Sequence, residues 1–136
     1  MNLTELANHV LASQPFSVLL GTQIGSIEPG KAELVIPLRA ELRQQHGFAH
    51  GGVVSYAADN AITFAGGSLL GDSLTAEYKI NYLRPAIGEK LIARAEVTHA
   101  GKRQAVCRCD IYVVHNGENK LCATAQGTVI KVETKE

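Results

Sequence analysis

The sequence lacks a long apolar run, an excess of charge of either sign, and an even set of cysteines, and each absence excludes a class of protein. No stretch approaches the roughly 20 apolar residues that cross a bilayer, and the opening segment has no basic region followed by an apolar stretch, as a secretory signal would. Lys and Arg together number 13, as do Asp and Glu, so the net charge is zero. Overall electrostatics therefore favour neither nucleic acid nor an anionic membrane, and we expect a cytoplasmic protein.

The three cysteines, Cys107, Cys109 and Cys122, contain no C-x-x-C pair. An odd number without that spacing argues against a disulfide framework and against a zinc site. Cys107 and Cys109 are two residues apart in a strand-like run, so both are expected to face one side as small buried groups.

The chain of 136 residues has room for one domain, residues 1–136, because a second core would be too small to be stable. Apolar residues at helical spacing predict a first helix over 3–12, with Thr4 as its N-cap and Pro15 as its end. Residues 22–38 then predict two strand-like segments, TQIGSIE and KAELVIPL, with a turn at Pro29-Gly30 between them. One face of the second segment carries Ala32, Leu34, Ile36 and Leu38.

Residues 53–67 predict the central element, a helix that stops at Gly66 and Gly67. Nine of the thirteen residues from Val53 to Ala65 are apolar and lie on nearly every face, which is typical of a buried helix. Four strand-like runs follow, separated by turn residues. They cover 74–85, 90–100, 104–115 and 120–132. One buried helix and a meander of long strands predict an α+β fold with the sheet wrapped around the helix.

The start of the central helix, His50-Gly51-Gly52, is the first candidate for chemistry. Glycines allow a ligand to approach the backbone, and a helix start presents unpaired N–H groups with a partial positive charge. Such groups can polarise a carbonyl and stabilise the oxyanion formed when it is attacked. The alternative is that the glycines only permit a tight turn into the helix.

Asp59 is the second candidate, because a carboxylate is costly to bury inside an apolar helix without partners. Ser55, Asp59 and Thr63 fall at i, i+4 and i+8 and form one polar stripe. Such a stripe lines either a hydrogen-bonded core network or a catalytic cleft. We favour function for an acid flanked by hydroxyl groups.

Gly51 and Asp59 are eight residues apart, which separates them by about 12 Å along a helix. A general base must come within about 3 Å of the reacting atoms or of an intervening water, so one chain cannot bring both groups to one carbonyl. Two antiparallel copies of the helix about a two-fold axis can. If both residues are catalytic, the protein is therefore at least a dimer with two shared sites.

Other residues carry weaker signals. His46 and His50 are four apart, but they lie in a glycine-broken loop without a third ligand, so we expect no metal. Gln44 could hydrogen-bond a substrate or a water, or be a solvated loop residue. Lys102 and Arg103 could bind phosphates, or be solvated turn charges. No G-x-S-x-G elbow indicates a serine triad.

At QQHGFAHGGVVSYAADNA, followed by TAEYKINYLRPA, the sequence resembles the hotdog-fold acyl-CoA thioesterases, particularly the phenylacetate-degradation type. The likeness extends over about 17–132, and its specific part is the combination of HGG, an acid eight residues after the first glycine, and a Tyr-x-x-Pro strand. The resemblance implies a five- or six-stranded antiparallel sheet around one long helix, a homodimer that often forms a tetramer, an acyl-CoA substrate and no cofactor.

The resemblance also implies roles for residues. Gly51 N–H would polarise the thioester carbonyl, Asp59 of the partner subunit would act as general base or nucleophile, and Thr75 would orient the water. The residues expected to complete that end of the site and to bind the substrate and its CoA portion are His50, Gln44, Gly52, Thr63, Arg84, Gly101, Lys102 and Arg103.

Two features leave the acyl group open. Asparagine often stands at the position of Gln44 in phenylacetate-type members, and Gln44 with Thr63 is similar to the 4-hydroxybenzoyl-CoA branch, which usually has glutamate where this chain has Asp59. Two other functions are possible on the same fold. A dehydratase acting on acyl carrier protein would need an H-x-x-x-x-P-G-x-P context that the sequence lacks, and a non-catalytic acyl-CoA binding module would not need Asp59.

Overall fold

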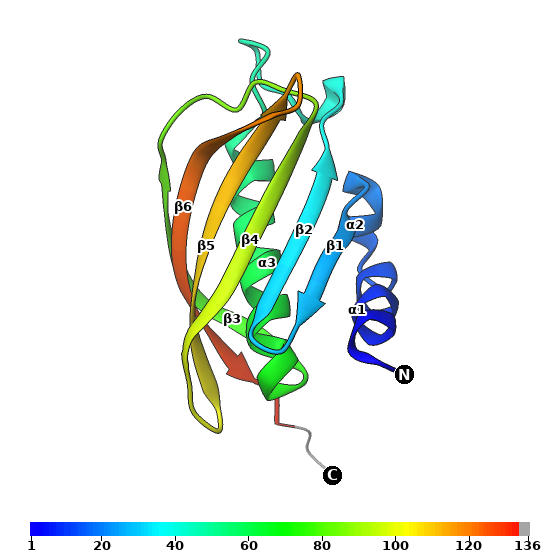
Figure 1. Cartoon of the computed structure of the whole chain (residues 1–136), viewed down its shortest axis with the longest axis vertical. Coiled ribbons are helices and arrows are strands. Elements are labelled where there is room, and N and C mark those ends of the chain that lie inside the picture. The colour runs from blue at the N-terminus through cyan, green and yellow to red at the C-terminus, as the bar shows by residue number, and fades with distance from the viewer. Residues whose placement is uncertain (134–136) are drawn as a thin grey trace.

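The computed structural model describes residues 1–133, in which one long helix, α3, is wrapped by a six-stranded antiparallel sheet (Figure 1). The elements in chain order are α1 (Leu3–Ala12), α2 (Pro15–Leu20), β1 (Gln23–Glu28), β2 (Lys31–Pro37), the 3-10 turn η1 (Ala40–Leu42), α3 (Gly51–Leu70), β3 (Ser73–Tyr82), β4 (Lys90–Ala100), β5 (Gln104–His115) and β6 (Glu118–Lys131). The predicted α+β architecture is confirmed, with six strands. Within residues 1–133, no helix is long and apolar enough to cross a membrane.

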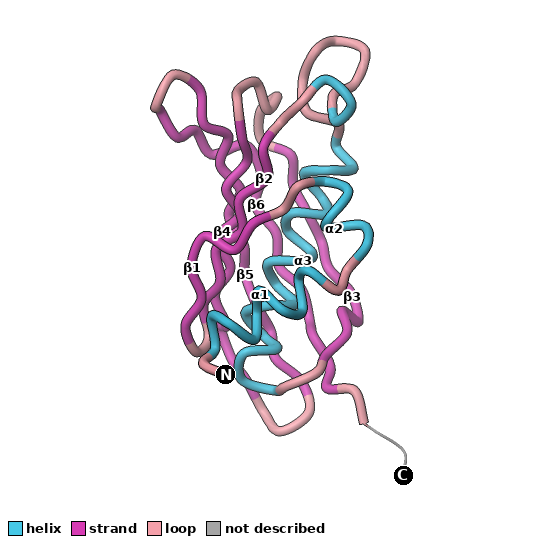
Figure 2. Tube along the Cα trace, turned by 90° about the vertical axis from the view of Figure 1, so that its right-hand side faces the viewer, coloured by secondary structure: helices cyan, strands magenta, loops and turns pink. Residues whose placement is uncertain are grey.

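The strands lie in the order β1-β2-β4-β5-β6-β3. Hairpins join β1 to β2, β4 to β5 and β5 to β6, whereas β3 follows α3 and pairs with β6 at the far edge. The helices α1, α2 and α3 lie on the same side of strands β1, β2, β4 and β5 (Figure 2). Both edge strands, β1 and β3, have a strand on one side only, and β1 is packed against α1 as well.

The core lies between α3 and the sheet. Small residues of the helix, such as Ala57, Ala61 and Ala65, are fully buried and let the backbone approach the strands closely. On the sheet side, β2 presents Ala32, Leu34 and Ile36, all 5% exposed or less, so the predicted alternation is confirmed there. The next residue of the predicted face, Leu38, lies just beyond the strand and is only half-buried.

The expected end of α3 at Gly66 and Gly67 is wrong, because the helix continues to Leu70 and stops at Gly71, whose φ of 90° few other residues adopt. Gly66 is needed for packing: a Cβ there would lie 3.0 Å from the Cβ of Val129 on β6. The glycine therefore allows helix and sheet to touch.

The N-terminal helix is confirmed over Leu3–Ala12, but its cap is Asn2 and not Thr4, since Asn2 Oδ1 accepts a hydrogen bond of 2.8 Å from the Glu5 N–H. Pro15 does not end α1. It begins α2, at the first helical position, where its missing N–H costs nothing.

The three cysteines are all buried and free, with Cys107 and Cys109 on the same inward face of β5, as predicted. Burial raises the pKa of the Cys107 and Cys122 thiols to about 11. It raises the pKa of the Cys109 thiol further, and the nearby Asp110 carboxylate and Cys107 add to that shift. These thiols are therefore apolar packing groups near neutral pH.

Candidate active site

The start of α3 carries an N–H group that has no partner among residues 1–133. His50 is the N-cap in extended conformation, and its Nδ1 accepts a hydrogen bond of 2.8 Å from the Gly52 N–H, so the His50 ring is fixed over the first turn. Within residues 1–133, the Gly51 N–H has no hydrogen-bond partner. The first turn of a helix concentrates partial positive charge at such a group.

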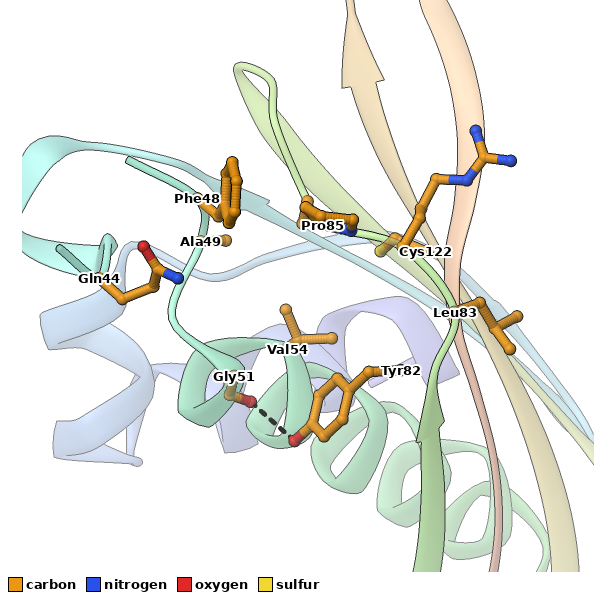
Figure 3. A pocket seen from close by; sticks show the side chains of 11 residues that line it. Gln44, Phe48, Ala49, Gly51, Val54, Tyr82, Leu83, Pro85 and Cys122 are labelled. Carbon is orange, nitrogen blue, oxygen red and sulfur yellow. Dashed lines mark hydrogen bonds between the residues drawn. The ribbon is translucent and has the colours of Figure 1, made fainter. Parts of the chain in front are cut away.

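A cavity of about 380 Å³ adjoins this helix start and is lined by two predicted site residues that Figure 3 shows, Gln44 and Gly51. A third predicted residue, Arg84, also lines it. The other walls of the cavity include Tyr82, whose hydroxyl donates a hydrogen bond of 3.1 Å to the Gly51 carbonyl. Tyr82 was not among the predicted site residues. The available signal was its place in the Tyr-x-x-Pro motif.

Gln44 is held by a short loop that precedes α3. Its backbone N–H donates to the Phe48 carbonyl at 2.8 Å, and its side-chain oxygen accepts from the His46 N–H. The other end of the amide is turned toward the cavity (Figure 3). His46 is thus part of the loop structure, and residues 1–133 contain no group of three or more His, Cys, Asp or Glu side chains arranged for a metal ion.

Asp59 lies in the middle of α3 and is half-buried in the single chain. The hydroxyl of Thr75 on β3 donates to Asp59 Oδ1 at 2.6 Å. Thr63 Oγ1 lies 2.7 Å from Thr75 Oγ1 and 3.0 Å from the Asp59 carbonyl oxygen. Because Thr75 has one hydrogen and gives it to the carboxylate, Thr63 is the donor when the two hydroxyls bond. The Thr75 hydroxyl therefore orients the carboxylate, and Thr63 holds the Thr75 hydroxyl from its other side.

Helix α3 and strand β3 are joined by hydrogen bonds at three levels. Gly51 bonds Tyr82, Ser55 bonds the hydroxyl of Tyr78, and Asp59 bonds Thr75. As residue numbers rise along the helix they fall along the strand, so the two elements run in opposite directions. The polar stripe predicted on the helix thus faces β3, and we call this set of three bonds the α3–β3 ladder.

The structure does not bring Gly51 and Asp59 together in one chain. Asp59 does not line the cavity at Gly51, and eight residues of α3 separate the two by about 12 Å. Each chain therefore has an unpaired N–H group at one end of the α3–β3 ladder and an oriented carboxylate at the other.

The predicted phosphate-binding residues are also divided. Arg84 is exposed beside the cavity at the start of α3, whereas Gly101, Lys102 and Arg103 form the turn between β4 and β5. The eleven residues of β4 span about 36 Å, and this turn lies at the opposite end of the sheet from the start of α3 (Figure 1). One chain cannot bind a single phosphate group with both.

Comparison with known proteins identifies the family. The model of the thioesterase superfamily matches residues 46–123, which include the start of α3, Asp59 and Thr75. The chain belongs to the thioesterase superfamily. It is 33% identical over 109 residues to the acyl-coenzyme A thioesterase PaaI of Escherichia coli, covering 79% of this chain and 76% of that protein. It is 29% identical over 119 residues to a 1,4-dihydroxy-2-naphthoyl-CoA hydrolase of Listeria monocytogenes, covering 85% and 95%.

Solved structures show the same fold for this thioesterase. A thioesterase family protein from Silicibacter pomeroyi superposes with a TM-score of 0.91 at 36% identity, covering 95% of this chain and 97% of that one. The hotdog fold and the family named from the HGG, acid and Tyr-x-x-Pro combination are confirmed. The thioesterase therefore needs a group that stabilises an oxyanion and a group that activates a nucleophile, and the α3–β3 ladder carries a candidate for each at its two ends.

Proposed function

We propose that this thioesterase hydrolyses an acyl-CoA thioester in two equivalent sites, each shared by two copies of the chain. The observation that carries the proposal is the half-buried carboxylate of Asp59, the one acidic side chain of α3. Thr75 orients it about 12 Å along the helix from the Gly51 N–H. Neither group alone accounts for hydrolysis. Together, across a dimer, they supply the two functions that the reaction needs.

The Gly51 N–H would bind the thioester oxygen. It lies at the positive end of a helix of 20 residues, and it is free to donate to the negative charge that develops when the carbonyl is attacked. His50 supports this role, because its bond to the Gly52 N–H keeps the first turn in place. The amide of Gln44, turned toward the same cavity, would contact the thioester or the attacking water.

Asp59 of the partner subunit would activate the nucleophile. As a general base, its carboxylate takes a proton from a water while the water oxygen bonds to the carbonyl carbon. The carbon–sulfur bond then breaks, and the CoA sulfur leaves and receives that proton. As a nucleophile, the carboxylate itself attacks the carbonyl carbon and the carbon–sulfur bond breaks, so that the CoA thiolate leaves. Water then hydrolyses the resulting anhydride to the free acid and the Asp59 carboxylate, and the proton released goes to the thiolate. In either case Thr75 and Thr63 hold the carboxylate in one orientation.

The edge strand β3 supports the shared site. It has no partner on its outer side within the described chain, and Leu74 and Tyr82 near its two ends are more than half exposed. Antiparallel pairing of two β3 strands about a two-fold axis near Tyr78 would set Thr75 of one chain against Tyr82 of the other. Since the α3–β3 ladder links these residues to Asp59 and Gly51, the same axis would bring the carboxylate of one chain to the N–H group of the other.

The same two-fold axis reverses one chain relative to the other, so the β4–β5 turn of one copy would approach the Arg84 end of its partner. We propose that Arg84 of one chain and Gly101, Lys102 and Arg103 of the partner lie along the CoA portion of the substrate. Charged side chains at both places suit the phosphates of CoA.

The direct test is Asp59→Asn, which nearly preserves shape and removes the base. We expect kcat for acyl-CoA hydrolysis, measured by release of the free thiol, to fall by about a hundredfold or more while the dimer stays folded. Circular dichroism and size-exclusion chromatography provide the control. Wild-type turnover by the folded variant would contradict the role of Asp59.

Mixing two inactive variants tests whether the site is shared. Asp59→Asn and Gly51→Pro homodimers are each expected to be nearly inactive. After subunit exchange, half of the dimers are mixed, and each mixed dimer has one site with both changes and one site with neither. Activity should then recover to about a quarter of the wild-type value per subunit. No recovery after verified exchange would mean that the two groups do not cooperate across an interface.

A further inference from the structure

A second cavity, of about 500 Å³, lies between α1, the C-terminal half of α3 and the segment that leads into β3. Its walls are mainly apolar and include Leu6 and Val10 of α1, Phe64 of α3, and Leu74 of β3. The volume is within the range of pockets that hold small organic ligands. The roles proposed for Gly51 and Asp59 do not use this cavity.

One wall of the cavity is connected to the carboxylate of Asp59 through two hydroxyl groups. Thr63 lines the cavity, and Thr63 Oγ1 lies 2.7 Å from the Thr75 hydroxyl that donates to Asp59. A group seated against Thr63 would thus be one hydroxyl away from the Asp59–Thr75 pair. Among the described residues that line the cavity, Asp72 is the one with a charged side chain, and it is exposed. The interior therefore suits an uncharged, apolar group.

Helix α1 presents apolar side chains to the cavity without covering them. Ala7 and Leu11 are buried at 3% and 6% exposure and fix the helix on the fold. Leu6 and Val10, one helical turn apart, line the cavity yet remain 48% and 39% exposed. The exposed apolar surface of Leu6 and Val10 would be removed from water if an apolar ligand bound in the cavity.

The shape favours a chain over a compact ring. The lining residues of α1 run from Leu3 to Val10, which is about 10 Å along the helix axis. On α3 they run from Thr63 to Ser68, so the cavity follows both helices lengthwise. A single aromatic ring would fill only the end next to Thr63, whereas an extended alkyl chain would use the whole length.

We propose that this cavity binds the acyl group of the substrate, that the group is an unbranched aliphatic chain of medium length, and that Leu6 and Val10 of α1 determine the length accepted. The inference rests on the proposed function, because it assigns the acyl end of the same thioester whose carbonyl Gly51 and Asp59 would serve. The chain enters past Thr63 and lies against Phe64 and α1.

The test compares kcat/KM for butyryl-, octanoyl-, palmitoyl- and phenylacetyl-CoA. The wild-type protein is expected to prefer octanoyl-CoA over butyryl-CoA and over phenylacetyl-CoA. Val10→Trp and Leu6→Trp, each at a partly exposed position, fill the cavity. Each methylene kept out of an apolar site lowers binding about fourfold, so the octanoyl-to-butyryl ratio of kcat/KM should fall by about tenfold or more.

His9→Trp is the matched control, because His9 lies on the same helix, is exposed and does not line the cavity. It should keep the wild-type ratio. An octanoyl-to-butyryl ratio of kcat/KM that is equal in the wild type and in both cavity variants overturns the acyl assignment. A wild-type preference for phenylacetyl-CoA overturns it too. Either result leaves the proposed function standing. A change of oligomeric state in the Val10→Trp and Leu6→Trp variants, measured by light scattering, would mean that a second copy of the chain covers the cavity. That result overturns the acyl assignment as well. No hydrolysis of any acyl-CoA overturns both proposals.

Discussion

Replacement of Gly51 by proline would remove one N–H group with little change to the fold. Gly51 is the first residue of α3, and proline is favoured at the first position of a helix. The residue before a proline must be extended, and His50 already has φ −60° and ψ 138°. A Cβ at position 51 would lie 3.6 Å from the Tyr82 ring, which is an ordinary van der Waals contact.

The expected loss follows from the role of that N–H group. Removal of one donor from an oxyanion site costs about a hundredfold to a thousandfold in kcat. Gly51→Ala is the matched control, because it adds the same Cβ beside Tyr82 but keeps the N–H. We therefore expect Gly51→Pro to lose about two to three orders of magnitude in kcat, whereas Gly51→Ala stays close to the wild type.

The assay is thiol release from an acyl-CoA at saturating concentration, with circular dichroism and size-exclusion chromatography to show that both variants are folded and have the wild-type oligomeric state. The comparison is between the two variants, so the effect of the added Cβ at the cavity cancels. Equal kcat values for Gly51→Pro and Gly51→Ala would refute the assignment of the Gly51 N–H to the oxyanion.

Three further predictions address orientation, substrate binding and packing. Thr75→Val removes the hydroxyl that holds Asp59 and should lower kcat by about tenfold or more with little change in KM. Thr75→Ser keeps a hydroxyl and should keep kcat near the wild-type value, so equal kcat for the two variants would contradict this role. Neutralising Lys102 and Arg103 together should raise KM for acyl-CoA and leave kcat nearly unchanged. KM for acyl-pantetheine, which lacks the nucleotide phosphates, should not change. An unchanged KM for acyl-CoA would exclude the two residues from the site. In thermal unfolding, Gly66→Ala should destabilise the fold by about 1–3 kcal/mol, because the added Cβ meets Val129. The adjacent Gly67→Ala has open space at its Cβ and should stabilise the fold by about 0.5–1 kcal/mol. Stability changes of the same sign in the two variants would refute the packing argument.

Periodicity predicted the elements well where local pattern and tertiary packing agree. The strands β4 (Lys90–Ala100) and β5 (Gln104–His115) have the predicted bounds, because turn residues flank a clear alternation. The end of α3 was missed because glycine pairs usually stop helices, and only the contact between Gly66 and Val129 shows why these glycines are inside one. That contact joins residues far apart in sequence.

The candidate site was likewise predictable in part from the sequence. A single acid in an apolar helix identified Asp59, and the hydroxyl groups on its helical face followed from spacing alone. The bond between Tyr82 and Gly51 depends on how β3 aligns with α3, which no local pattern specifies. Likewise, Arg84 and Arg103 are similar in type, but only the length and direction of β4 show that they lie at opposite ends of the sheet.

The buried thiols bear on how the activity can be measured. A thiolate, and not a thiol, attacks a disulfide reagent, and a thiol with a pKa of about 11 has only about one thiolate in a thousand molecules at pH 8. Cys107, Cys109 and Cys122 are also shielded from bulk solvent. A chromogenic disulfide added to the folded protein should therefore report the coenzyme released and not the protein itself. By the same reasoning, the protein should resist forming mixed disulfides with the free thiol that it produces.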